Sequence, residues 1–295
     1  MTQHASYADT QQHHDEAGLA DLLNLDAQAF APYLDRLTGW VGQHVLTPPR
    51  RILDLGAGTG TGSLALARRF SAAEVVAVDT SALMLERLRA AALEQGVGHR
   101  VRAVQADLDL APPAVGGTDL AWAASSLHHV ADPDRVLRDV HAALGPGGLL
   151  VVIEMDDQPR FLPDDIGMGR PGLEARCHRV MAQAKWNSHP NWRPHLERAG
   201  FEIAEERCFP IKVDAAPPST RHYARTYLSR VRSALDGQLA PDDLETQDHL
   251  LGDGPHALLR RTDLEVRSSR TAWAALRPGY PPNTSPSAFP SSATP

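Results

Sequence analysis

The 295-residue sequence has little of several features that would assign it to a specialised class of protein. It has only two cysteines, Cys177 and Cys208, which stand alone without metal-binding spacing, so we expect neither a disulfide framework nor a metal site. No apolar run approaches the roughly 18 residues of a membrane-spanning helix, and no signal peptide is recognisable. These absences predict a soluble, cytoplasmic protein that does not associate with a membrane.

Positive charge is also scarce. The sequence has 29 Lys and Arg against 36 Asp and Glu, which gives a formal net charge of −7, and its arginines are scattered. A nucleic-acid partner requires a basic surface, so we do not expect one. A small-molecule substrate and a monomeric or homodimeric state are the predictions that remain.

The glycine-rich segment of residues 51–60 lacks the spacing that is typical of dinucleotide binding. It reads Arg-Ile-Leu-Asp-Leu-Gly-Ala-Gly-Thr-Gly, and the third glycine of a Gly-x-Gly-x-x-Gly pattern would fall at Thr61 or Ser63. Asp54, just before the turn, would repel a pyrophosphate but suits a ligand with an ammonium group. The segment therefore disfavours a nicotinamide-dependent oxidoreductase, which is kept as an alternative.

A second acidic residue lies where a ribose-binding carboxylate is usually found. Asp79 ends an apolar run and follows Gly60 by 19 residues. An acidic residue about 20 positions beyond a glycine loop binds ribose hydroxyls in nucleotide-binding folds. Glycines also let the backbone approach a ligand closely and adopt positive φ. Together the two features predict a cofactor that contains adenosine.

Residues 54–60 resemble the first motif of the class I S-adenosylmethionine-dependent methyltransferases. Three later segments, within residues 101–108, 118–130 and 144–154, agree with that family, so the resemblance covers residues 50–155. It implies S-adenosylmethionine as the cofactor, with the acidic strand ends near its ammonium group, its ribose and its adenine. The cofactor-binding residues that it implies are Asp54, Gly56, Ala57, Gly58, Asp79, Thr80, Asp107, Leu108 and Ser125.

Strand and helix patterns alternate from Arg51 to Glu154, which is typical of a parallel sheet covered by helices on both faces. The resemblance implies an α/β, Rossmann-like sheet of seven strands, mostly parallel, with an antiparallel last strand near residues 264–276. We expect a mobile start over the first 17 residues. The expected parts are an N-terminal helical lid (1–47), a methyltransferase domain (48–276) with lid insertions (156–190 and 215–255), and a disordered tail (277–295).

Two adjacent histidines are the best candidates for a general base. Leu127-His128-His129-Val130 resembles the stretch after the fourth strand in methyltransferases of the ubiquinone and menaquinone type. Imidazole titrates near neutrality, as a general base should, although either ring could instead pack against the cofactor or the loop. Tyr7 is a further candidate, because the N-terminal lid could place it over the methyl group. Glu154 could face a substrate amine or lie in a solvated acidic loop.

We therefore predict methyl transfer from S-adenosylmethionine to a small organic acceptor. No Asn-Pro-Pro-Tyr-like motif follows the fourth strand, where Ala-Ser-Ser-Leu occupies residues 124–127. This disfavours methylation of a nucleobase or a protein glutamine, and it favours a carbon or oxygen acceptor, in natural-product biosynthesis for example. A protein that binds the cofactor without catalysis is a further alternative, and the sequence leaves the acceptor open.

Overall fold

The structure is a computed structural model that describes residues 2–111, 115–213 and 218–279. The side chains of residues 2–15 and 218 lie outside this description. No helix in the described ranges is both long and apolar enough to cross a membrane.

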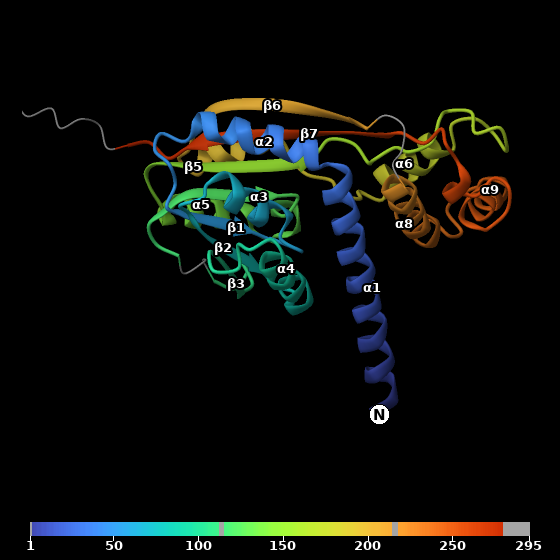
Figure 1. The fold of residues 1–295 in the computed structure, drawn as a ribbon, viewed down its shortest axis with the longest axis horizontal. Helices are drawn as coiled ribbons and strands as arrows, with labels where there is room; N and C mark the ends of the chain where they lie inside the picture. Colours follow the sequence, from blue (N-terminus) through green and yellow to red (C-terminus); the bar gives the residue numbers. More distant parts are fainter. Residues whose placement is uncertain (1, 112–114, 214–217, 280–295) are drawn as a thin grey trace, which may run out of the picture.

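A seven-stranded sheet in the order β3-β2-β1-β4-β5-β7-β6 forms the centre of the molecule (Figure 1). Only β7 runs antiparallel to its neighbours among the described strands, as expected from the family resemblance. The strands are β1 (Arg51–Leu55), β2 (Glu74–Asp79), β3 (Val101–Gln105), β4 (Thr118–Ala124), β5 (Leu144–Met155), β6 (Glu202–Val213) and β7 (Val266–Leu276).

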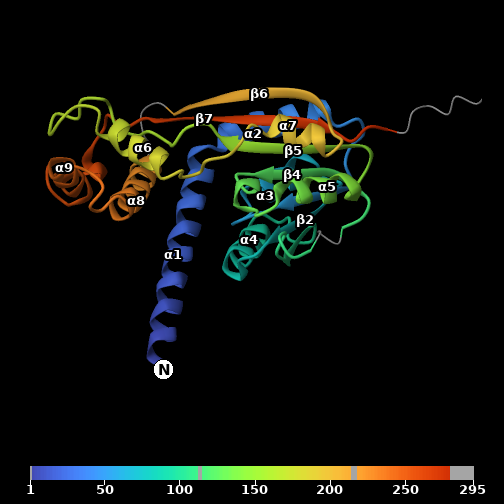
Figure 2. The ribbon, with the colours of Figure 1, turned by 180° about the vertical axis from the view of Figure 1, so that it is seen from behind.

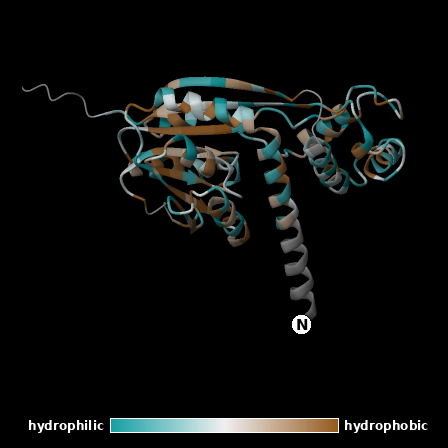
Figure 3. Ribbon diagram, in the orientation of Figure 1, coloured by the Kyte–Doolittle hydropathy of each residue, from teal (hydrophilic) through white to brown (hydrophobic). Residues whose placement is uncertain are grey.

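Helices cover both faces of the sheet. Successive side chains of a strand point to opposite faces, so Ile52 belongs to one buried cluster and Leu53 to the other. The first cluster includes side chains of α2 (Ala31–His44), α3 (Thr61–Arg69) and α4 (Ala82–Glu94), and the second those of α5 (Pro133–Ala143) and α7 (Trp192–Arg198) (Figures 1 and 2). Figure 3 shows that the inner strand β5, which is covered on both faces, is mostly hydrophobic, whereas the edge strand β6 is largely hydrophilic.

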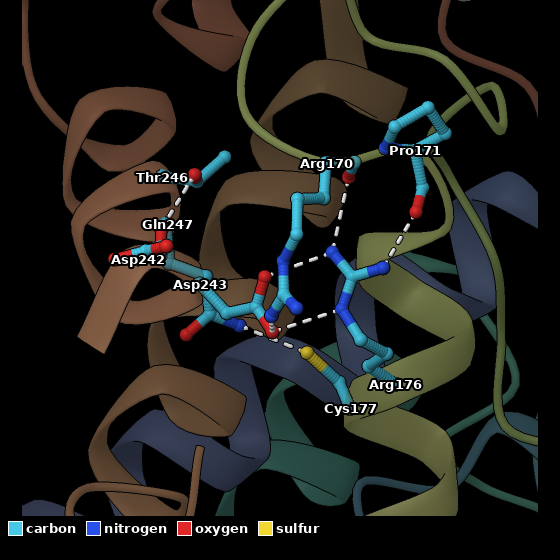
Figure 4. A network of polar contacts seen from close by, with 8 residues as sticks. All are labelled: Arg170, Pro171, Arg176, Cys177, Asp242, Asp243, Thr246 and Gln247. Carbon is cyan, nitrogen blue, oxygen red and sulfur yellow. Dashed lines mark hydrogen bonds and ion pairs between the residues drawn. The ribbon is translucent and has the colours of Figure 1, made fainter. Parts of the chain in front are cut away.

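A helical cap stands beyond one end of the sheet and is made of α6 (Leu173–Gln183), α8 (Pro218–Ala234) and α9 (Pro241–Leu251) (Figure 1). The short η2 (Leu258–Arg260) connects it to β7. The buried Asp243 of α9 accepts from Arg176 of α6 through two nitrogens, each at 2.8 Å, and from Arg170 at 2.9 Å (Figure 4). These ion pairs join α9 to α6. The long helix α1 (Thr2–Ala29) runs between the cap and the sheet in both views (Figures 1 and 2).

α1 begins at Thr2, within the stretch that we expect to be mobile. The segment has no proline and its first glycine is Gly18, so nothing in it interrupts a helix. α7 begins at Trp192, because the side chain of Asn191 accepts from Arg193 N at 3.0 Å and caps the helix there. The disorder predicted for the tail lies mostly outside the described residues.

Candidate active site

A cavity of about 600 Å³ opens at the carboxyl ends of the central parallel strands. Ligands of open α/β sheets bind at this edge. The cavity is lined by the glycine turn, by the loops after β2, β3 and β4, and by side chains of α1, α2 and α8. It brings together nine residues that the sequence suggested for the cofactor: Asp54, Gly56, Ala57, Gly58, Asp79, Thr80, Asp107, Leu108 and Ser125.

The glycine turn after β1 is held in a conformation that suits glycine. Gly56, Gly58 and Gly60 have φ of +68°, +53° and +89°. A Cβ on Gly56 would lie 2.5 Å from Cβ of Ser126, so no larger residue fits without displacement. The amides of Gly56 and Ala57 donate to the carbonyl of Val78 at 2.8 and 2.9 Å, which fixes the turn against the end of β2.

Asp54 is a buried carboxyl group beneath this turn, with 2 % of its surface exposed. Its Oδ2 accepts from the hydroxyl of Ser63 at 2.6 Å. The pKa of Asp54 is raised to about 7. Burial is the main cause and the nearby Asp79 carboxylate adds to it, whereas the Ser63 hydrogen bond acts in the opposite direction. Such a group gains most from a cation that binds beside it, because a cation compensates the charge that burial disfavours.

Asp79, at the end of β2, accepts hydrogen bonds on both oxygens. Gly58 N donates to Oδ2 at 2.8 Å and Ser81 N donates to Oδ1 at 2.9 Å. Each carboxylate oxygen keeps a second lone pair for a ligand hydroxyl. Asp107 was expected at the end of the third strand, but it lies two residues beyond the end of β3. Its Oδ1 accepts from Asp109 N at 2.8 Å.

His128 lies in the 3₁₀ turn η1 (Leu127–His129) and is bound to Glu154 at 2.9 Å through Nδ1. The other oxygen of Glu154 accepts from Trp192 Nε1 at 3.2 Å. Indole nitrogen only donates, so Oε1 of Glu154 acts as an acceptor, and an ionised Glu154 can only accept from Nδ1 of His128 through Oε2. Nε2 of His128 is buried and has no hydrogen-bond partner in the part of the chain that the structure describes. Glu154 therefore orients His128, a role that the sequence did not suggest.

His129 differs from its neighbour. Its ring centroid is 4.1 Å from that of His128, it is exposed, and the structure gives it no carboxylate partner among the described residues. Partial burial and the neighbouring His128 lower its pKa. Tyr7 lies on α1, but its side chain lies outside the described part of the structure. Of the three catalytic candidates, only His128 has an orienting partner in the described structure.

A second polar cluster lines the cavity and was missed at the sequence level. Arg270 of β7 donates to both oxygens of Asp26 on α1, at 3.1 and 3.0 Å, and the hydroxyl of Tyr223 on α8 donates to Asp26 at 2.7 Å. Tyr33 of α2 lines the same wall. The available signal was Asp26 itself, a carboxylate directly after Leu25, but its partner lies 244 positions away.

Comparisons with known proteins agree with this architecture. A family described as a methyltransferase domain matches residues 52–148. The sarcosine/dimethylglycine N-methyltransferase of Halorhodospira halochloris is 31% identical over 218 residues, which cover 71% of this chain and 72% of that protein. The demethylmenaquinone methyltransferase of Thermus thermophilus is 38% identical over 112 residues, which cover 38% of this chain and 50% of that protein. A provisionally assigned sarcosine dimethylglycine methyltransferase from Galdieria sulphuraria shares the fold, with a TM-score of 0.51 and 15% identity over 85% of this chain and 87% of that one.

The chain belongs to the class I S-adenosylmethionine-dependent methyltransferases, and S-adenosylmethionine is its methyl donor. The geometry fits this cofactor. No cationic side chain of the described residues pairs with the buried carboxyl of Asp54, and each oxygen of Asp79 keeps a lone pair for a ligand hydroxyl.

Proposed function

We propose that the protein methylates a carbon or oxygen atom of a small organic acceptor and that His128 is the general base. The pairing of His128 with Glu154 at 2.9 Å carries this proposal. It holds the proton on Nδ1 and leaves the lone pair on Nε2, which can take a proton from a hydroxyl or an acidic carbon. A base is useful for such acceptors, whereas a neutral amine can attack before it loses its proton.

For the cofactor, we propose that each acidic strand end binds a different part. Asp54 would bind the ammonium group, directly or through water, the backbone of residues 56–58 would lie along the methionine part, and Asp79 with Thr80 would bind the ribose. Asp107 and Leu108 would contact the adenine, and Ser125 would border the methionine part. S-adenosylmethionine supplies an electrophilic methyl group on a sulfonium. The cavity that these residues share supports the assignment.

The segments outside the sheet would act as a lid, at residues 1–47, 156–190 and 215–255, around a methyltransferase domain at 48–276. Side chains from each segment line the cavity, among them Leu23, Gln158 and Tyr227. Excluding water favours a reaction that neutralises the sulfonium charge and prevents the base from being solvated. We also propose a cytoplasmic enzyme, monomeric or homodimeric, that acts in natural-product biosynthesis. The size of the lid supports a small-molecule acceptor.

The test uses purified protein, methyl-labelled S-adenosylmethionine and fractionated metabolite extracts, with the labelled product identified by mass spectrometry. With that acceptor, His128→Ala should lower kcat by about 10²- to 10⁴-fold, the range of general-base catalysis. His129→Ala is the matched control and should retain turnover within a few fold. Both variants should bind S-adenosylhomocysteine like the wild type. Equal turnover of the three proteins at saturating cofactor would show that no base resides in this loop.

Nitrogen methylation is the second candidate, because the relative from Halorhodospira halochloris is named for sarcosine and dimethylglycine. Both amines should therefore be included as acceptors in the assay. Their rapid methylation, with little effect of His128→Ala, would favour this candidate over carbon or oxygen methylation.

A further inference from the structure

We infer that Tyr33 and Arg270 together bind an uncharged oxygen of the methyl acceptor, either a carbonyl or a hydroxyl. The inference rests on the proposed function, because it assigns the acceptor end of the same cavity. Tyr33 comes from α2 and Arg270 from β7, and both side chains line the cavity that also contains the cofactor-binding candidates. No motif of the sequence joins them.

The guanidinium of Arg270 is fixed in place. Its Nη2 lies 3.0 and 3.1 Å from the two oxygens of Asp26. Its Cζ lies 5.2 Å from the ring centroid of Phe30 and 5.4 Å from that of Tyr33, within the range of cation–π contacts. An acceptor would therefore meet a preorganised cation rather than a flexible side chain.

Two donors of this cluster lack partners. The hydroxyl of Tyr33 and Nε of Arg270 are buried, and neither makes a hydrogen bond of normal geometry within residues 2–111, 115–213 and 218–279, although the Arg270 guanidinium is near enough to oppose the effect of burial on the pKa of Tyr33. A buried donor that lacks a partner costs about 1–3 kcal/mol, so such groups are uncommon unless a ligand or water binds them. The other two tyrosines of the wall are satisfied: Tyr223 donates to Asp26 at 2.7 Å and Tyr227 to Gln158 at 2.9 Å.

The charges of the cluster select the kind of oxygen. Asp26 already compensates Arg270, so an acceptor carboxylate would bring an unpaired negative charge into a largely buried site. An ammonium group only donates hydrogen bonds, so it would face the donors of Tyr33 and Arg270 and the cation itself. The oxygens of Asp26 already accept from Arg270 and Tyr223. Burial raises the pKa of Tyr33 to about 12, so its hydroxyl stays protonated and can donate. A neutral oxygen can accept from both free donors without changing the charge of the site.

Protein saturated with S-adenosylhomocysteine is titrated with one of three small probes, acetophenone, benzoate or benzylammonium. Binding of each probe is followed by protein NMR. Acetophenone should bind more tightly than the two ions. Tyr33→Phe should weaken acetophenone by about 2- to 12-fold, the range expected for one hydrogen bond. Tyr227→Phe is the matched control, because it removes a hydroxyl of the same wall that already has a partner, and it should change the affinity less than twofold. Arg270→Lys keeps the charge and removes Nε, and it should also weaken acetophenone.

The outcomes separate this inference from the proposed function. Unchanged affinity for S-adenosylhomocysteine and an unchanged circular dichroism spectrum show that each variant is folded. Benzoate or benzylammonium binding as tightly as acetophenone would overturn the inference, and so would the absence of acetophenone binding or an unchanged affinity in Tyr33→Phe. Failure of the wild type to bind S-adenosylhomocysteine would instead contradict the cofactor site on which the proposed function depends.

Discussion

Protonation of Asp54 should compete with cofactor binding near neutral pH. The carboxyl group is buried and its pKa is raised to about 7, chiefly by burial. An ammonium group bound beside it requires the carboxylate, so a proton must leave Asp54 when the ligand binds at lower pH. Affinity for S-adenosylhomocysteine should therefore rise with pH through about 7 and level off above it.

The expected size follows from the pKa of about 7. Below that pH the apparent Kd increases about tenfold for each unit, which corresponds to about 1.4 kcal/mol. Between pH 8 and pH 6 the affinity should fall about tenfold, and about 0.9 proton should be released at pH 6, since this linkage follows directly from the fraction of protonated carboxyl.

Calorimetry in buffers of different ionisation enthalpy measures both quantities. 5′-Methylthioadenosine is the control ligand, because it keeps the adenosine and lacks the ammonium group, and its affinity should not follow this profile. Asp54→Asn should bind S-adenosylhomocysteine more weakly and without the pH slope, since the amide cannot ionise. A flat profile for the wild type, or an equal slope in the variant, would refute the pairing of Asp54 with the ammonium group.

Three further outcomes test other parts of the structure. Asp79→Ala should weaken S-adenosylhomocysteine by roughly 1–3 kcal/mol in calorimetry, and unchanged affinity would mean that the ribose binds elsewhere. Asp243→Asn should lower the free energy of unfolding in urea by about 1–3 kcal/mol at pH 7, because it loses charge-assisted bonds from Arg176. Arg176 lowers the pKa of Asp243, so this stabilisation should be lost as pH falls below the ordinary value of 3.8, and a deficit that persists in acid would argue against the ion pair. Gly56→Ala should destabilise the fold by about 1–3 kcal/mol, since its φ is +68° and the added Cβ would lie 2.5 Å from Ser126; a wild-type melting curve would contradict this geometry.

The cofactor half of the site could be predicted from the sequence because its signals are local. Asp54 and Asp79 each sit at the end of a buried strand, and parallel strands bring their carboxyl ends to one edge. The alternating strand and helix pattern predicted the parallel sheet, and the family resemblance implied its antiparallel last strand. No contact between distant segments had to be known in advance.

The Asp26–Arg270 cluster of the cavity could not be predicted because it depends on pairings between segments that share no pattern. Asp26 on α1 and Arg270 on β7 meet only after the sheet has formed, and neither residue type marks a motif. The distinction between His128 and His129 likewise came from Glu154, which among the described contacts pairs with His128 and not with His129. Adjacent identical residues differ in this way only when their three-dimensional surroundings are known.

The contact between Arg270 and Asp26 can form only late in the synthesis of the chain. Every strand that carries a cofactor-binding candidate has been synthesised by residue 155, whereas β7, which contributes Arg270 to the opposite wall, begins at Val266. Domains generally fold as units, but the glycine turn and its acidic strand ends are made long before the residue that fixes α1. α1, although made first, cannot be pinned by Arg270 until nearly the whole described chain exists. A nascent chain stalled between these points contains every cofactor-binding candidate but lacks the ion pair that holds α1 against β7.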